Sequence, residues 1–132
     1  MPRRSDCPIS NVLDFVGDKW SLLILRDLLF FKKRTYSELQ ASDERMATNI
    51  LSSRLVRLEQ DGLITKRTDA NDRRKRVYAL TQAGKDMLPI MLEMIVWSGK
   101  YDPSTNASKQ MIERIKHDRE SLMHDVLGRL EG

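Results

Sequence analysis

The side chains best suited to chemistry in this chain are small polar and cationic residues in its middle. The segment 48–61 is predicted to be a helix, and the face opposite its leucines carries Asn49, Ser52 and Ser53. A helix that needed only solubility would more often carry Glu or Lys there. Asn can read adenine and Arg can read guanine through paired hydrogen bonds, so this face predicts base readout in duplex DNA. The candidate residues are Thr48, Asn49, Ser52, Ser53, Arg54 and Arg57.

Two alternatives remain open for this helix. Its polar face could be an ordinary solvated surface. Arg54 lies nearer the apolar side, so it could pair with Asp61 or reach a phosphate instead of a base.

A second group of candidates follows in a predicted hairpin. Residues 63–76 hold six cations against two anions, a net charge of +4 that equals the excess of the whole chain. Charge focused in this way favours a polyanionic partner and phosphate or minor-groove contact, whereas the alternative is a solvated turn. The cationic candidates are Arg67, Arg73, Arg74, Lys75 and Arg76.

The elements that must position these residues follow from caps and periodicity. Short helices are predicted at 9–15, after Asp18, and after Thr35, which forms a capping box with Glu38. Strands 63–68 and 76–80 form the hairpin. Thr81 starts a fifth helix that Pro89 should kink, and one long helix should run from residue 104 to the end. The predicted fold class is mainly α with a small β-hairpin wing (α+β), a winged helix-turn-helix.

The predicted domain organisation is a DNA-binding domain at 1–103 and a dimerisation helix at 104–132, within one compact unit. The last helix carries an apolar stripe from Met111 to Leu130 that has no obvious partner inside so small a domain. Together with Val12, Leu13 and Val16 of the first helix, it predicts a homodimer interface.

Composition excludes several classes of protein. The 132 residues suit one domain, and no apolar run approaches the ~18–20 residues of a membrane span. The start, MPRRSDCP, lacks the apolar region of a secretory signal. A single cysteine allows no internal disulfide, so we expect a cytoplasmic protein.

Catalysis and cofactors are not expected. The chain has no nucleophile elbow, phosphate-cradling glycine loop or cysteine pair for zinc. His117 and His124 are about 10 Å apart along one helix, too far to share a metal. We therefore predict no enzyme activity, no metal site and no cofactor.

Three other residues invite a site but have plainer interpretations. Cys7 precedes a helix start, where the positive end of the dipole favours a thiolate, so it is a candidate redox residue. A buried structural thiol is the favoured alternative. Trp20 and Trp97 are interpreted as core residues.

The segments CPISNVLDFVGDKWSLLILRDLLFFKKRTYSELQ, ILSSRLVRLEQDGLI and LTQAG resemble HxlR-type bacterial regulators over roughly residues 7–99. The resemblance implies a homodimeric winged-helix transcription factor in a prokaryotic cytoplasm, and some relatives sense oxidants near the position of Cys7. The wing DANDRRKRVYALT is more similar to the MarR family, in which an Asp-x-Arg element directs an arginine to the minor groove; Asp72 and Arg74 have that spacing. A small-molecule or redox effector is thus a candidate partner.

The leading hypothesis is a homodimeric regulator that binds pseudo-palindromic double-stranded DNA. The alternative is a winged-helix module that binds a protein through the same helix. A protein-docking helix should present a large apolar anchor. This face has only Val56 among its serines, which favours DNA.

Overall fold

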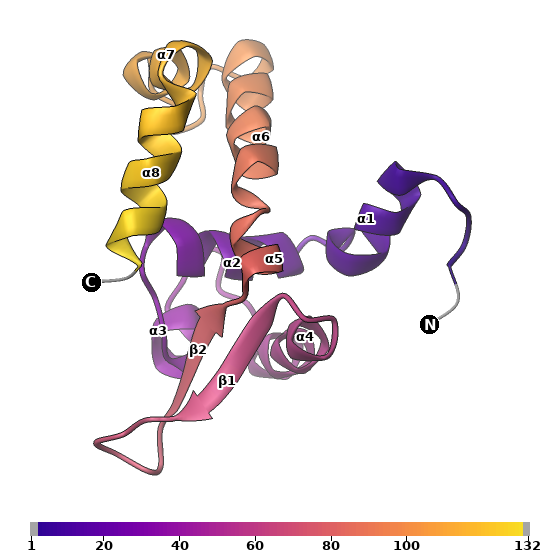
Figure 1. Ribbon diagram of the computed structural model, residues 1–132, viewed down its shortest axis with the longest axis vertical. Helices are drawn as coiled ribbons and strands as arrows, with labels where there is room; N and C mark the ends of the chain where they lie inside the picture. Colours follow the sequence, from indigo (N-terminus) through magenta and orange to yellow (C-terminus); the bar gives the residue numbers. More distant parts are fainter. Residues whose placement is uncertain (1–2, 131–132) are drawn as a thin grey trace. The chain divides into compact units, whose positions relative to one another are not determined.

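The computed structural model describes residues 3–130, and its contacts divide the chain into two units, Met1–Gly84 and Lys85–Gly132 (Figure 1). The first unit contains α1 (Pro8–Val16), α2 (Ser21–Phe30), α3 (Tyr36–Gln40), α4 (Thr48–Gln60), β1 (Ile64–Thr68) and β2 (Arg76–Leu80). The second contains α6 (Leu88–Tyr101), α7 (Lys109–His117) and α8 (Arg119–Arg129), and the short α5 (Gln82–Lys85) spans the division. The mainly helical fold with one hairpin confirms the predicted winged helix-turn-helix. The division into functional domains after residue 103 stays a prediction.

The core of the first unit is built from leucines at helical spacing. Leu51, Leu55 and Leu58 of α4 are fully or almost fully buried. They recur every three or four residues, so they share the face that packs against α2 and β1. Burying that face turns the opposite, polar side of α4 outward.

Local signals set the ends of these helices as predicted. The Thr35 hydroxyl accepts a hydrogen bond from the Glu38 amide (3.3 Å), and a Glu38 carboxylate oxygen accepts one from the Thr35 amide (3.0 Å), which is a complete capping box. Gly62 has φ +80°, a left-handed conformation that ends α4 at little cost only for glycine.

The hairpin is fixed to the helices through β2. β1 and β2 are antiparallel, with Ile64 opposite Leu80 and Thr68 opposite Arg76. The Tyr78 amide donates to the Arg34 carbonyl (2.7 Å), which ties β2 to the start of α3. Beyond the hairpin, a Cβ on Gly84 would lie 2.2 Å from the Leu63 carbonyl oxygen, so the chain can pass there only as glycine.

The second unit differs from the prediction in two places. The predicted fifth helix is interrupted between α5 and α6, because Pro89 occupies the first turn of α6, where its missing amide costs nothing. The prediction of a single long helix from residue 104 to the end is wrong. Asp118 (φ −144°, ψ 38°) leaves the helical region, and α8 turns back to contact α7.

This turn changes the predicted apolar stripe. Ile115, Leu122 and Val126 are buried within the chain, so much of the stripe already has intramolecular partners. Conversely, Trp97 is 67% exposed, and its interpretation as a core residue is wrong; Trp20 is half-buried. None of the helices within residues 3–130 is long and apolar enough to cross a membrane.

Candidate nucleic-acid interface

The outward face of α4 is exposed along its length. Thr48, Asn49, Ser52, Ser53 and Val56 are all accessible, opposite the buried leucines. Within residues 3–130, the Asn49 amide makes no side-chain hydrogen bond, so its donors and acceptor are available. The small polar members of the predicted set therefore lie together on one accessible surface.

The two arginines of the predicted set are already engaged. Arg54 Nε donates to Asp18 Oδ2 at 2.7 Å. Arg57 Nη2 donates to the Asp14 carbonyl oxygen at 2.7 Å, and its Nε lies 3.6 Å from Asp61 Oδ2. The suggested pair between Arg54 and Asp61 is thus wrong, because Arg57 takes Asp61. Base readout by Arg57 stays a prediction, and it would require the guanidinium to leave these partners.

Asp18 contacts both the start of α2 and the side chain of Arg54 in α4. Its carboxylate accepts hydrogen bonds from the amides of Trp20 (3.2 Å) and Ser21 (2.8 Å) while it also binds Arg54. Partial burial opposes ionisation, but the bonds from Ser21 and then Arg54 outweigh it and hold the pKa of Asp18 below its ordinary value. The N-cap residue of α2 is Trp20, so the prediction of Asp18 as the N-cap is wrong; the Asp18 carboxylate instead links the turn before α2 to α4.

Tyr36 borders the outward face of α4, which the sequence did not reveal. Its hydroxyl lies 3.1 Å from both the Thr48 carbonyl oxygen and the Ser52 hydroxyl, so it links α3 to the outward face of α4. A shallow depression of about 240 Å³ opens beside it. Its lining residues are Tyr36, Ser52, Leu55, Val56, Glu59, Lys66 and Tyr78. Sixteen residues separate Tyr36 from Ser52, beyond the reach of helical periodicity.

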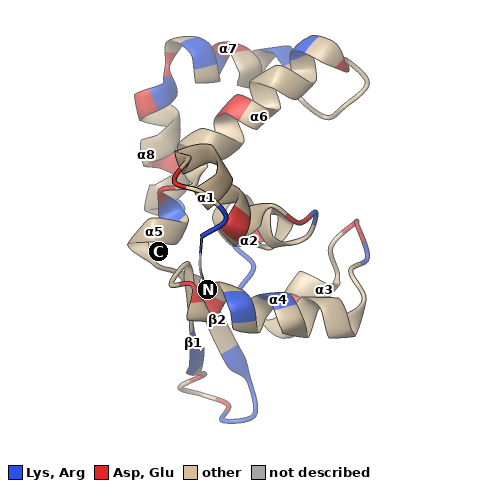
Figure 2. Cartoon of the chain, turned by 90° about the vertical axis from the view of Figure 1, so that its right-hand side faces the viewer, with Lys and Arg blue, Asp and Glu red and all other residues tan. Residues whose placement is uncertain are grey.

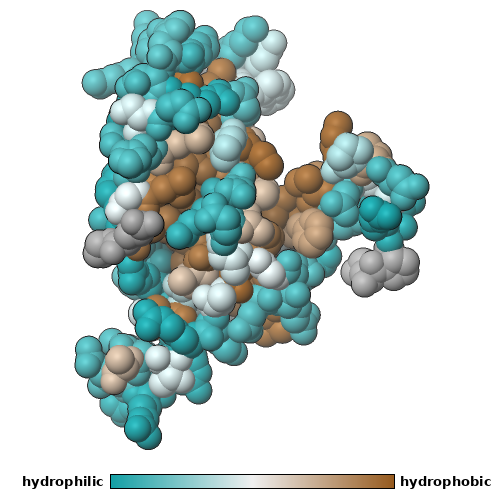
Figure 3. Space-filling view, viewed as in Figure 1, coloured by the Kyte–Doolittle hydropathy of each residue, from teal (hydrophilic) through white to brown (hydrophobic). Residues whose placement is uncertain are grey.

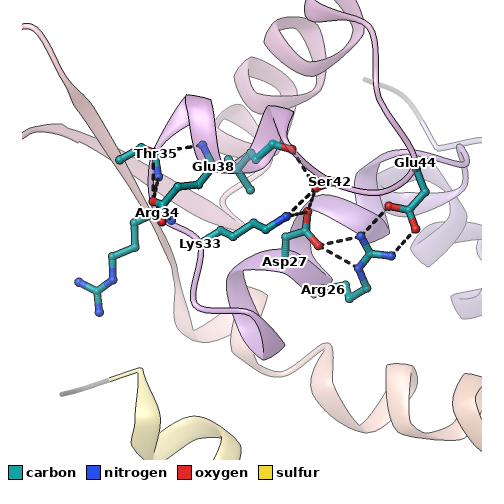
Figure 4. A network of polar contacts seen from close by, with 9 residues as sticks. Arg26, Asp27, Lys33, Arg34, Thr35, Glu38, Ser42 and Glu44 are labelled. Carbon is teal, nitrogen blue, oxygen red and sulfur yellow. Dashed lines mark hydrogen bonds and ion pairs between the residues drawn. The ribbon is translucent and has the colours of Figure 1, made fainter. Parts of the chain in front are cut away.

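A buried carboxylate holds the turn between α3 and α4 in place (Figure 4). Asp27 of α2 is buried and accepts hydrogen bonds from Arg26 (2.7 Å) and from the Ser42 hydroxyl in the turn. The Lys33 ammonium donates to the Ser42 oxygen (3.0 Å) and lies 3.5 Å from Asp27. The network ties the turn to α2, which fixes the angle at which α4 leaves α3.

The same network extends to Glu44. Arg26 donates from two nitrogens to the two Glu44 oxygens, at 2.6 and 2.8 Å. This forked pair lowers the pKa of Glu44 to about 2 and raises that of Arg26 above its ordinary value. Sequence analysis missed this cluster, since nothing in the spacing of Arg26, Asp27, Ser42 and Glu44 indicates that they meet.

The wing presents its cations to solvent. Arg67, Arg73, Arg74, Lys75 and Arg76 are all exposed, and Figure 2 shows the positive charge along the hairpin. Asp72 Oδ1 accepts a hydrogen bond from the Arg74 amide (3.0 Å) and lies 3.5 Å from Arg74 Nε. The Arg74 side chain is 93% exposed. The predicted Asp-x-Arg element thus forms a local contact that presents one arginine outward.

Cys7 lies at the N-terminal end of α1. Its carbonyl oxygen accepts from the Asn11 amide (2.9 Å), and its own amide donates to the Ser5 hydroxyl (3.2 Å). The residue is exposed, so its interpretation as a buried structural thiol is wrong. In the described part of the chain, no three His, Cys, Asp or Glu residues group as metal ligands would.

A polar helix face beside a cationic hairpin, both held on a helical core, defines a winged helix-turn-helix DNA-binding protein. The chain belongs to the HxlR-like helix-turn-helix family, whose sequence profile matches residues 15–106. Family membership makes it a DNA-binding transcriptional regulator rather than an enzyme.

Individual relatives agree with this assignment. The chain is 33% identical over 95 residues to the HTH-type transcriptional regulator YdeP of Bacillus subtilis. The matched region covers 72% of this chain and 73% of YdeP. It is 34% identical over 95 residues to Rv3095 of Mycobacterium tuberculosis, covering 72% of this chain but only 59% of that longer regulator. The crystal structure of PA1607 superimposes with a TM-score of 0.70 at 30% identity, over 80% of this chain and 72% of PA1607. The structure of the redox regulator HypR in its oxidized form superimposes with a TM-score of 0.59 at 26% identity, over 71% of this chain and 96% of HypR.

Proposed function

We propose that this regulator acts as a homodimer on a pseudo-palindromic operator. One α4 from each protomer would enter successive major grooves, and each wing would follow the adjacent backbone or minor groove. The observation that carries this proposal is the exposed face of α4, from Thr48 to Val56, which is narrow, polar and free of long side chains. The four consecutive cations of the wing tip, residues 73–76, supply the phosphate attraction beside it.

Exposed apolar helix faces support the dimer. Ile90, Met94, Trp97 and Tyr101 of α6 are spaced by four, three and four residues, so they form one stripe, and all four are exposed. The Trp97 and Tyr101 rings lie 5.1 Å apart. On α1, Ile9 and Leu13 are exposed at helical spacing, and Figure 3 shows apolar surface on both helices. A second copy of the chain would remove these surfaces from water.

The alternative, a module that binds a protein through α4, has weaker support. Interfaces of that kind place an aromatic or large aliphatic anchor at their centre. The centre of the α4 face is Ser52 and Ser53, and the exposed aromatic residues of the described chain lie outside α4, the most exposed being Trp97 and Tyr101 of α6.

Regulation by an oxidant is a further part of the proposal. Cys7 is exposed, and one structural relative is a redox regulator. As the only cysteine, it would act through a disulfide between protomers or an adduct with a small thiol. Diamide treatment followed by non-reducing electrophoresis should give a linked dimer from the native protein and none from Cys7→Ser. A cytoplasmic location stays a prediction.

The experiment for the main proposal is selection of bound fragments from random duplex DNA by the full chain, with stoichiometry measured on the enriched site. A two-fold symmetric sequence bound by two protomers is expected. As a control, the triple variant Asn49→Ala, Ser52→Ala, Ser53→Ala should retain its fold and enrich nothing. Enrichment of no sequence by the native protein, or binding of a symmetric site by a single protomer, would contradict the proposal.

A further inference from the structure

We propose that the α4 face reads A·T base pairs, with Asn49 hydrogen-bonded to an adenine and Val56 packed on the C5-methyl group of a thymine. This inference rests on the proposed function, since it names the bases that the same surface recognises. It is carried by which side chains of α4 are free to contact bases and which are engaged in hydrogen bonds within the protein.

The residues suited to guanine are held elsewhere. Guanine is read chiefly by Arg or Lys, and the only such residues in α4 are Arg54 and Arg57. Arg54 is bound to Asp18, in the segment between α1 and α2, and Arg57 to the carbonyl of Asp14 within α1, each at 2.7 Å. Moving either into the groove would remove this hydrogen bond from the Asp18 carboxylate or the Asp14 carbonyl. The arginines of α4 therefore position the helix, and the bases are left to its other side chains.

Asn49 is the available partner for adenine. It is exposed in the first turn of α4, where recognition helices make their base contacts, and its amide has no side-chain hydrogen bond within residues 3–130. An amide can donate to adenine N7 while it accepts from adenine N6, which no other base edge in the major groove matches. By contrast, the nearby Ser52 hydroxyl is already paired with Tyr36.

Val56 is the available partner for thymine. It is 50% exposed on a face that is otherwise polar, and its neighbours Leu55 and Tyr36 line the adjoining depression of about 240 Å³. An apolar side chain left in water on a DNA-facing surface gains free energy if it meets the one apolar group in the major groove, the thymine methyl.

The two residues are seven positions apart, and two helical turns bring them back to the same face. That separation is about 10 Å along the helix axis. It corresponds to roughly three base-pair steps, given about 34 Å per turn of duplex. Each half-site should therefore contain two A·T pairs at about that spacing.

The test uses the full chain and the symmetric site obtained by selection. Each thymine is replaced by uracil, which removes only the methyl group, and each adenine by 7-deazaadenine, which removes only the N7 acceptor. The dissociation constant is measured by fluorescence anisotropy at one fixed salt concentration. One uracil position per half-site should weaken binding roughly three- to fourfold, and one deaza position about tenfold.

The variants assign these losses to residues. Val56→Ala should abolish the uracil effect and retain the deaza effect, and Asn49→Ala should do the reverse. Gln60→Ala, an exposed residue one turn further along α4, is the matched control and should retain both. Because the base substitutions also act on the native protein, the test does not depend on any variant folding.

Four outcomes would overturn the inference. A selected half-site with G·C at these positions, or one insensitive to uracil, would overturn it while the proposed function stands. An analogue effect that persists in the matching alanine variant would assign the contact to another residue. If no sequence is enriched at all, the inference falls together with the proposed function.

Discussion

Arg54 Nε lies 2.7 Å from Asp18 Oδ2, and this ion pair joins the middle of α4 to the turn that opens α2. Both side chains are partly buried, and the same carboxylate accepts a hydrogen bond from the Ser21 amide at the start of α2. The position of α4 is therefore coupled to a turn 36 residues earlier in the chain.

Asp18→Asn should weaken this coupling while keeping the hydrogen bonds from the Trp20 and Ser21 amides, because the amide oxygen can still accept from the backbone. We expect the free energy of unfolding to fall by roughly 1 kcal/mol. A double-mutant cycle with Arg54→Gln, measured by denaturant unfolding, should give a coupling energy of similar size. Asp43→Asn, an exposed aspartate, is the control for stability. Additive effects of the two substitutions would show that the ion pair does not stabilise the fold.

Asp27→Ala should be the most destabilising single change around the helix-turn-helix. It would leave Arg26, Lys33 and Ser42 without the buried acceptor they share, at a cost of about 2–4 kcal/mol. Chemical denaturation measures the loss, with Ser42→Ala as a milder comparison because it leaves both cations paired. Equal stability of Asp27→Ala and the native protein would show that this network does not stabilise the fold.

The Arg26–Glu44 pair should make stability depend on pH at the acid end. The pKa of Glu44 is about 2 in the folded protein against an ordinary value of 4.5, so the folded state binds this proton less readily than the unfolded state. The contribution is therefore fully present above about pH 4.5 and is lost as the pH falls toward 2. Melting temperatures between pH 6 and 2 should decline less steeply for Glu44→Gln than for the native protein. Glu113→Gln on the surface of α7 should follow the native curve more closely.

Arg74→Ala should weaken binding to operator and random duplexes by similar factors, because an exposed wing arginine addresses phosphate or groove shape more than base identity. The slope of log affinity against log salt should fall by about one counterion. Titrations at four salt concentrations measure both quantities, and Lys116→Ala on α7 is the control for loss of a distant surface charge. A loss confined to the operator would instead make Arg74 a base-reading residue.

Trp97→Glu should give a monomer, because it places a charge in the middle of the exposed α6 stripe. Sedimentation velocity decides the oligomeric state, and operator affinity should drop by at least tenfold once the two half-sites are no longer bound together. Lys116→Glu, a surface change on α7, should remain a dimer. An unchanged dimer in the Trp97 variant would place the interface elsewhere.

The sequence by itself determined the elements that depend on neighbouring residues. The capping box of Thr35 and Glu38, the stop at Gly62 and the spacing of Asp72 and Arg74 all act over two to four positions, so their types indicate their structure. The recurrence of leucines every three or four residues likewise predicted which side of α4 is buried, and hence that Asn49 lies on the opposite side.

Only the tertiary structure decided features that depend on which distant segments meet. Helical periodicity is the same on both sides of Asp118, so it could not reveal that α8 turns back on α7. The spacing within α6 could not tell whether Trp97 faces a core or solvent. Nor could it show that Asp14, Asp18 and Tyr36 bind the residues of α4, because a hydrogen bond between remote segments depends on packing and not on local propensity. Those contacts also decided the direction of the two α4 arginines.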